Sequence, residues 1–408
     1  MRTNTSQTHK KIAFLLGSGV SIPAEMPSTS NITERVLSGE GVMRHTDGNY
    51  YFDTPLYAHM GIPDEYVPRV VIFLNRLKIE IDLYYLYQTG RIANYEDLYY
   101  VASQIKDSES GEYDNPAVQP FIDKILPEIQ PLLQGTENGS VHEWQLLTLA
   151  MEATHYISDV VWHLLYKEPS RTDRLNCLID ACKDDQMSRV DIFTLNHDTV
   201  IERCLSQAGV QVNDQVTDGF GKPLNNVRYW EPDLFENESF KVRLLKLHGS
   251  VNWFRFRPNS GGWSNESIGI PPDWDIWHTK SPQGQLQWPI DGRPMFLAGT
   301  FNKMFQYTSG IYADLYCHFY RSLPHSQRLV VSGYGFGDKG INTRIAEWIY
   351  SAPDRRILLI HPEPENLKRS ARGAISNKWD EWIDQRTLNI LPKRIEDTSW
   401  DEIRDRLI

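Results

Sequence analysis

The stretch KIAFLLGSGVS at residues 11–21 decides the fold of this 408-residue chain. Five consecutive apolar residues, 12–16, lead directly into Gly17-Ser18-Gly19. A short apolar run of this kind is typical of a strand buried on both faces, as in a parallel sheet. Glycines at the turn after such a strand let backbone approach a phosphate closely. The third glycine of a dinucleotide fingerprint and a Walker lysine are both missing, so this motif alone is unspecific.

Further apolar runs of strand length follow the first, with polar or small residues after them. They are VDIFTL at 190–195, LLKL at 244–247, LVV at 329–331 and ILLI at 357–360. Helical patterns lie between some of these runs, which favours an α/β, doubly wound parallel sheet.

The first two strand-like runs lie far apart, and most of the intervening sequence is helical in pattern. Residues 67–88, 94–105 and 142–166 each predict a helix, and Ser170 is a candidate cap for another at 171–183. We therefore predict a sheet domain made of residues 1–40 and 185–408. A largely helical insertion at 41–184 interrupts it.

Composition excludes several classes of protein. Hydrophobic residues make up 40% and charged residues 23% of the chain, which is typical of a globular protein. The 42 basic and 53 acidic residues give a net charge of −11. Because duplex binders and anionic-membrane binders normally carry a basic excess, we expect neither direct nucleic-acid binding nor membrane binding.

Targeting signals and metal motifs are lacking in the sequence. The apolar run at 12–16 is shorter than the roughly seven residues that an export signal needs, and no stretch has the about 18 that a membrane span needs. We therefore expect a cytoplasmic protein. The four cysteines form no Cys-x-x-Cys pair, so the sequence predicts buried thiols, no disulfide framework, no zinc ribbon and no metal.

Polar residues follow three further strands, and each group has a structural alternative. Thr194-Leu195-Asn196-His197-Asp198 ends the second strand. Asn196 and Asp198 are candidate ligand contacts, and the alternative is that they cap the next helix. His248 ends the third strand and is a candidate general base, although a lone histidine is more often structural. SGYGFGD at 332–338, with Asn342 beyond it, is a second glycine-rich loop or a plain turn. The carboxyl ends of parallel strands meet at one edge, which is where ligands bind in open α/β sheets.

The segment 253–288 differs from the rest of the chain. Its five tryptophans, Trp253, Trp263, Trp274, Trp277 and Trp288, stand among Gly, Pro, Ser and Asn residues. Such a segment predicts a loop-rich satellite core, with a contact surface or pocket wall as the alternative.

Taken in order, four of these motifs resemble the sirtuin-like family of NAD-dependent enzymes. They are GSGVS at 17–21, TLNHD at 194–198, KLHGS at 246–250 and SGYGFGD at 332–338. The stretches 94–100 and 333–342, the helical insertion and the lack of zinc cysteines resemble the bacterial branch that acts as NAD glycohydrolases in antiphage defence. The resemblance implies a Rossmann-like sheet, NAD as substrate and abortive infection by NAD depletion.

The resemblance also implies a role for each matching position. Asn196 would position the water or ribose, Asp198 would contact the nicotinamide carboxamide, and His248 would be the general base. Cofactor-binding positions would be Gly17, Ser18, Gly19, Ser21, Thr194, Ser332, Gly333 and Asn342. A free-standing chain of this size is similar to the member paired with a HerA-type hexameric ATPase, and such enzymes are by default homo-oligomers.

Two departures from the deacylases of the family weaken an acyl-lysine substrate. Residues 23–28, PAEMPS, stand where the deacylases carry an Asp-Phe-Arg segment, and 253–288 stands where their zinc module would be. The alternatives are an NAD-dependent deacylase, which would turn over only with an acyl peptide, and a non-catalytic module that binds NAD or ADP-ribose as a scaffold. His197 stands where the family carries an aliphatic residue.

Overall fold

The computed structural model describes residues 10–52, 65–88, 90–112, 115–137, 140–259, 266–272, 275–299 and 302–407. The chain divides into two compact units. Unit 1 holds residues 1–26, 168–297 and 303–408, and unit 2 holds residues 27–167 and 298–302. The long segment of unit 2, 27–167, overlaps the insertion that we placed at 41–184, and residues 298–302 belong to this unit as well.

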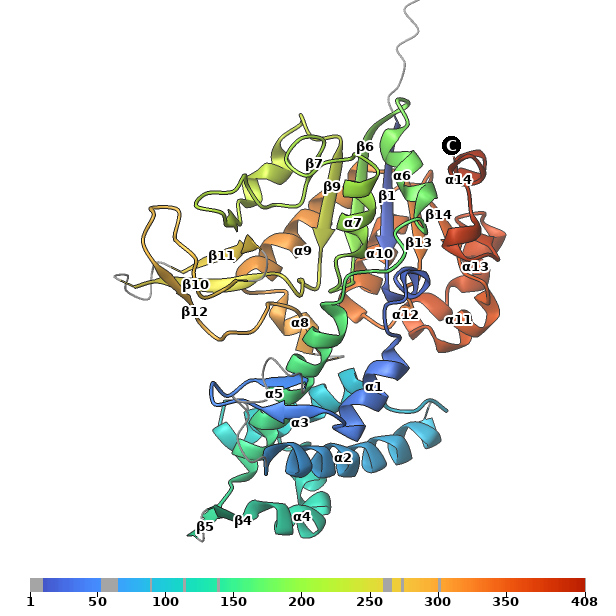
Figure 1. Cartoon of the computed structure of the whole chain (residues 1–408). Helices are drawn as coiled ribbons and strands as arrows, with labels where there is room; N and C mark the ends of the chain where they lie inside the picture. The colour runs from blue at the N-terminus through green and yellow to red at the C-terminus, as the bar shows by residue number, and fades with distance from the viewer. Residues whose placement is uncertain are drawn as a thin grey trace, which may run out of the picture. The chain divides into compact units, whose positions relative to one another are not determined.

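Unit 1 is built on a seven-stranded sheet in the order β15-β14-β13-β1-β6-β9-β7 (Figure 1). Every described pairing in this sheet is parallel, as predicted. Its strands are β1 (Lys10–Leu16), β6 (Met187–Thr194), β7 (Val216–Thr217), β9 (Val242–Lys246), β13 (Arg328–Ser332), β14 (Arg356–Ile360) and β15 (Leu388–Leu391). The five predicted runs correspond to β1, β6, β9, β13 and β14, which confirms the doubly wound α/β class.

The order of the strands defines where a ligand would bind. Leaving β7 aside, the strands from β9 to β15 follow the chain order 3-2-1-4-5-6. The order reverses between β1 and β13, which lie side by side with Leu16 opposite Ser332. In open α/β sheets, the crevice outside the carboxyl ends of the strands at this reversal is the ligand site.

Helices cover both faces of the main sheet, which explains the apolar runs in its strands, although Asp191 of β6 and Arg243 of β9 are also buried. Ala13 and Leu15 belong to the core that includes residues of α9 and α10, while Phe14 points the other way and its ring lies 6.5 Å from that of Trp400 in α14. Successive side chains of a strand alternate between faces, so a strand covered on both sides has no polar face. The helices of unit 1 are α6 (Asn176–Lys183), α7 (Val200–Gln207), α8 (Asn302–Gln306), α9 (Gly310–Ser322), α10 (Lys339–Tyr350), α11 (Pro364–Ser370), α12 (Gly373–Ser376), α13 (Trp379–Asp384) and α14 (Trp400–Leu407).

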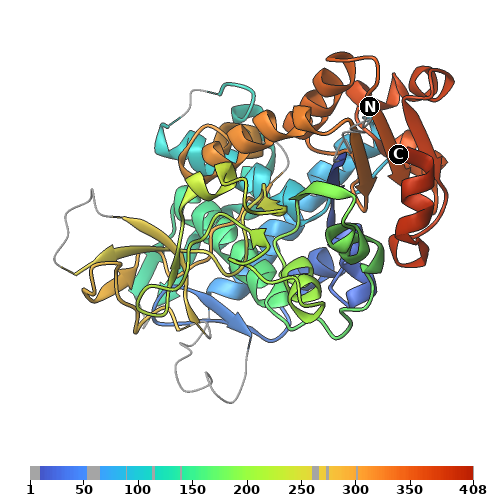
Figure 2. The ribbon, with the colours of Figure 1, turned by 90° about the horizontal axis from the view of Figure 1, so that it is seen from above.

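The tryptophan-rich segment forms regular structure instead of the predicted loops. A four-stranded antiparallel sheet runs in the order β12-β10-β11-β8 and lies to one side of the main sheet (Figure 2). Its strands are β8 (Arg228–Tyr229), β10 (Phe254–Pro258), β11 (Ser267–Ile270) and β12 (Gln287–Pro289). Trp253 is buried with Phe220 and Trp230, whereas Trp277 and Trp288 are exposed; Trp263 and Trp274 lie outside the described residues. Our prediction missed these strands because they are short and rich in residues typical of turns.

Unit 2 is mainly helical. Its helices are α1 (Thr29–Ser38), α2 (Tyr66–Gln88), α3 (Tyr95–Ser110), α4 (Gln119–Leu133) and α5 (Leu146–Leu165). A short hairpin of β2 (Val42–Arg44) and β3 (Tyr50–Phe52) lies between α1 and α2 in the sequence. A second hairpin, β4 (Gln134–Glu137) with β5 (Ser140–Glu143), lies between α4 and α5. Helix α5 packs against α3 and α2. The predicted helices at 67–88 and 94–105 correspond to α2 and α3.

One predicted cap was wrong. Ser170 does not begin a helix, because α6 starts at Asn176, and the Ser170 hydroxyl instead donates to Glu25 Oε2 over 2.6 Å. Among the described helices, none is long and apolar enough to cross a membrane. The described residues also include no group of three or more His, Cys, Asp or Glu side chains that could hold a metal ion.

Candidate active site at the switch point of the sheet

Two loops meet at the switch point, one after β1 and one after β13. The Gly17 N–H donates to Ser332 O over 3.0 Å, and the Gly19 N–H donates to Gly333 O over 3.0 Å. A Cβ atom on Gly17 would lie 2.5 Å from Gly333 O, and one on Gly19 would lie 2.7 Å from Gly333 Cα. Because backbone this close leaves no room for a side chain, the glycines allow the two loops to close the crevice floor.

Backbone amides of the first loop are largely used within the protein. The Val20 N–H bonds to Gly17 O, and the Ser21 N–H bonds to Ser18 O, which closes a short 3-10 turn. The Ser18 amide takes part in none of these bonds, and Ser18 is exposed. The glycines thus act first through close packing, and a role of the exposed Ser18 in phosphate binding stays a prediction.

Asn196 lies beside the first loop and has an unmet hydrogen-bonding group. Its Nδ2 donates to Ser21 Oγ over 2.9 Å, and its backbone N–H donates to Thr194 Oγ1 over 3.1 Å. The amide oxygen Oδ1 is buried and has no hydrogen-bond partner among the described residues. A buried acceptor without a partner is costly, so its presence points to a donor supplied by a ligand or a water.

Asp198 takes a more structural position than Asn196. Its carboxylate accepts from the Val200 N–H over 3.0 Å at the start of α7. Its backbone oxygen accepts from Lys246 Nζ, which also pairs with Glu202 Oε1 at 2.8 Å. Asp198 thus accepts from the first residue of α7, although Thr199 is the N-cap of this helix and no side chain caps it.

His248 lies in a buried network with two side chains from later parts of the chain. Its Nε2 is 2.7 Å from Tyr307 Oη and 3.2 Å from Asp338 Oδ2. The Tyr307 hydroxyl donates to the same Asp338 oxygen over 2.9 Å. Asp338 Oδ1 accepts from the Ile341 N–H over 3.0 Å and caps α10. The Nε2 atom of His248 therefore contacts both Tyr307 and Asp338.

The charges of this network are set by burial and by the pairing itself. Burial would raise the pKa of Asp338, but the hydrogen bond and positive charge of His248, together with the charge of Lys303, lower it below its usual value. Burial, reinforced by the Asp338 carboxylate, raises the pKa of Tyr307 well above its usual value. Asp338 is thus ionised and Tyr307 neutral at physiological pH.

His197 lies next to this network. Its ring centroid is 6.2 Å from that of His248 and 4.9 Å from that of Phe296. Burial, followed by the positive charges of His248, Lys303 and Lys246, lowers the pKa of His197 well below its usual value. A neutral imidazole is therefore expected at position 197, and its Nδ1 has no hydrogen-bond partner among the described residues.

The second glycine-rich loop is held together by its own side chains. Tyr334 Oη donates to Asn342 Oδ1 over 2.8 Å, and Asn342 Nδ2 donates to Phe336 O over 2.8 Å. Ser332 Oγ donates to Ile360 O over 3.1 Å, within the sheet. Asn342 and Ser332 thus shape the loop, and both of their side chains are already hydrogen-bonded. Gly333 has a φ of +66°, which a side chain would disfavour.

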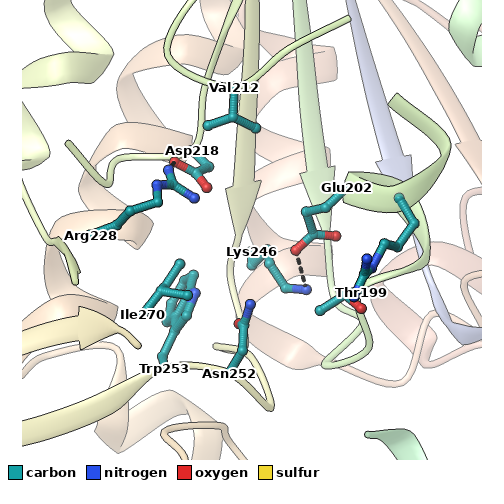
Figure 3. Close-up of a pocket in the computed structure, with 10 residues that line it drawn as sticks. Thr199, Glu202, Val212, Asp218, Arg228, Lys246, Asn252, Trp253 and Ile270 are labelled. Atoms are coloured by element: carbon teal, nitrogen blue, oxygen red, sulfur yellow. Dashed lines mark hydrogen bonds and ion pairs between the residues drawn. The ribbon is translucent and has the colours of Figure 1, made fainter. Parts of the chain in front are cut away.

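A cavity of about 170 Å³ lies at the same edge of the sheet, near the carboxyl ends of β9 and β7 (Figure 3). Thr199, Glu202, Asp218, Arg228, Lys246 and Trp253 are among its lining residues. Burial raises the pKa of Glu202, which pairs with Lys246 across this cavity wall. None of the predicted site residues lines the cavity, so we assign the chemistry to the switch point, where the unmet Asn196 oxygen lies.

Sequence reasoning missed three residues of the site. Asp338 stood in a quoted motif without a role, and Tyr307 and Lys303 were not singled out. Lys303 is buried, and its charge acts on both His197 and Asp338. No spacing rule connects these residues to His248, because they lie 55 or more positions away; Asp338 alone carried a local signal, as a capping residue after a glycine-rich loop.

Known proteins give one family match and several distant structural matches. Solved structures similar to this chain include a Sir2 homologue in complex with NAD, at 13% identity and a TM-score of 0.35, covering 98% of this chain and 90% of that one. Another is a mutant Sir2 homologue in complex with ADP-ribose, at 12% identity and a TM-score of 0.33, covering 98% and 93%. A TM-score this low says nothing about what the present chain binds. No curated protein matches the sequence significantly. Residues 190–382, from β6 to α13, match the family model of the SIR2-like domain.

Proposed function

We propose that this protein is an NAD⁺ glycohydrolase that cleaves the nicotinamide–ribose bond to give ADP-ribose and nicotinamide. The observation that carries the proposal is the buried, unpartnered Oδ1 of Asn196 at the switch point of the sheet. The SIR2-like match over residues 190–382 and the ordered motifs of the sequence support NAD as the ligand of this edge.

Hydrolysis of this bond requires few catalytic groups from the protein. The nicotinamide leaves without protonation because it is already cationic in NAD⁺, and the ribose passes through an oxocarbenium-like state. Water then adds to the anomeric carbon and loses one proton. Asn196 Oδ1 can accept a hydrogen bond from that water or from a ribose hydroxyl, and His248 can take the proton, directly or through the hydroxyl. Ser18 and the closed glycine loops would lie towards the pyrophosphate.

The buried carboxylate of Asp338 adds an electrostatic argument. An ionised side chain at the crevice favours the positive charge that develops on the ribose. The positive charge of Lys303, which also acts on Asp338, opposes this effect.

The test is NAD⁺ consumption by the purified chain, with the products separated by chromatography. Release of ADP-ribose and nicotinamide without an acyl peptide is expected. Turnover that requires an acyl-lysine peptide would show a deacylase. Binding of NAD or ADP-ribose with no product, with or without an ATPase partner, would show a scaffold; either result contradicts the proposal.

We further propose a role in antiphage defence by NAD depletion, together with a HerA-type ATPase. This proposal is supported by the resemblance of the stretches 94–100 and 333–342, together with the helical insertion, the lack of zinc cysteines and the size of the chain. The same assay, repeated with the co-purified ATPase, tests it, because activity that does not change on addition of the partner would contradict control by that partner.

Self-association is proposed through one face of α2 in unit 2. Ile72, Ile79 and Leu86 are 53%, 55% and 59% exposed and recur every seven residues along the helix. A two-fold axis through Ile79 would bring Ile72 of one copy against Leu86 of the other, so the stripe is self-complementary. Ile79→Glu is expected to lower the molar mass measured by light scattering to that of a smaller species. Gln88→Glu, which introduces the same charge at an exposed position on the opposite face of α2, is the control. An unchanged mass would exclude this face.

A further inference from the structure

We infer that Asp338 and Tyr307 are positioning residues that set the tautomer of His248 and thereby make it a base. The inference rests on the proposed function only for its kinetic consequence. The juxtaposition itself is structural, because β9, the segment after α8 and the cap of α10 bring the three side chains within hydrogen-bonding distance of one another.

Proton positions in the network follow from which groups can donate. Asp338 is ionised and can only accept, and Tyr307 keeps its proton and donates it to Asp338 Oδ2. The Tyr307 oxygen, 2.7 Å from His248 Nε2, is then left to accept. Both neighbours of Nε2 therefore require a proton on that nitrogen. The neutral ring then has Nδ1 as its basic nitrogen.

The surroundings of His248 contain other charged and titratable groups. His197 faces its ring and is neutral, while Lys303 contributes a positive charge that acts on Asp338. Tyr316 stacks on Tyr307 at a centroid distance of 4.7 Å, and the Tyr334 hydroxyl accepts from the Asp338 N–H over 3.2 Å. Among these groups, the Asp338 carboxylate is the anion that contacts the His248 ring, so it favours the protonated form of His248 once the proton of the reaction has arrived.

Asp338→Asn separates positioning from folding. Asparagine caps helices as well as aspartate does, so its Oδ1 can still accept from the Ile341 N–H. The oxygen that faces His248 and Tyr307 is replaced by an NH₂ group, which can only donate. His248 Nε2 must then accept, the ring proton moves to Nδ1, and the basic nitrogen is lost.

The expected kinetic result is a loss of kcat of about 10²- to 10⁴-fold in Asp338→Asn, the range over which general-base catalysis acts, with KM changed little. Tyr307→Phe removes the hydroxyl but keeps the carboxylate, so a smaller loss, about tenfold, is expected. Tyr316→Phe is the matched control, because it removes a hydroxyl from the same ring stack that bonds to Gly340 O and not to His248.

A readout independent of turnover keeps the inference testable if NAD⁺ is not the substrate. In protein labelled with ¹⁵N-histidine, the His248 signals, assigned with His248→Gln, should show a proton on Nε2 in the wild type and on Nδ1 in Asp338→Asn. Absence of NAD⁺ turnover with this tautomer change would contradict the proposed function but support the positioning role. An unchanged tautomer, or a wild-type kcat in a folded Asp338→Asn, would overturn the inference.

Discussion

Replacement of Asn196 by alanine is expected to lower NAD⁺ turnover by about 10²- to 10³-fold, the loss typical of removing one preorganised polar group from a transition state. Asn196 Oδ1 is buried without a partner, so it has no structural bond to lose, while Nδ2 donates to Ser21 Oγ. The free energy of unfolding should therefore change by only about 1–2 kcal/mol, mainly from the loss of the Ser21 bond. Steady-state kinetics and urea unfolding of the same preparation measure the two effects.

Ser21→Ala is the control for Asn196→Ala. It removes the partner of Nδ2 and leaves Oδ1 in place, so its effect on stability should be similar and its effect on turnover much smaller. The opposite pattern, in which Asn196→Ala unfolds the protein at lower urea but turns over NAD⁺ at the wild-type rate when folded, would mean that Asn196 is structural.

Replacement of Gly333 by alanine is expected to have the largest effect on stability. A Cβ at this position would lie 2.5 Å from Val20 N and 2.8 Å from Gly17 O. Both are backbone atoms, so no side-chain rotation can relieve the clash. The φ of +66° adds about 1–2 kcal/mol of strain for a residue with a side chain. Since the two loops must separate to make room, we expect a total loss of about 3–5 kcal/mol in the free energy of unfolding, together with loss of nucleotide binding.

Gly335→Ala is the matched control in the same loop. No atom lies within 4 Å of a Cβ at this position, and its φ is not in the left-handed region. The free energy of unfolding of Gly335→Ala should stay within about 1 kcal/mol of the wild-type value. Alanine lowers the conformational entropy of the unfolded chain, and this effect favours the folded state. Equal urea midpoints for the two variants would show that the contact between the loops after β1 and β13 does not hold this edge together.

Local sequence was enough to place the elements of the sheet. The runs that became β1, β6, β9, β13 and β14 are apolar because both of their faces are covered, and this requirement appears in the residues themselves. The strands that the sequence did not reveal are β7, with two residues, and the small antiparallel sheet. Short strands bury few side chains, so tertiary pairing rather than a local pattern decides their existence.

Only part of the candidate site could be predicted in the same way. Thr194, Asn196 and His248 each follow a strand directly, and a parallel sheet brings such ends to one edge whatever the loops do. The roles that we gave them stay predictions. Ser332 and Asn342 also come from this reasoning, but the structure shows their side chains bonded within the sheet and the loop, which no spacing could reveal.

The amino-acid sequence by itself therefore determined the sheet, the edge at which its polar residues gather and the glycines that let two loops touch, because each depends on residues adjacent in the chain. The tertiary structure decided which side chains meet across that edge. Ser21 and Asn196 are 175 positions apart, and His248 meets Tyr307 and Asp338 at 59 and 90 positions. Hydrogen bonds over such separations depend on how loops and helices pack, so the network that fixes His248 became visible only in three dimensions.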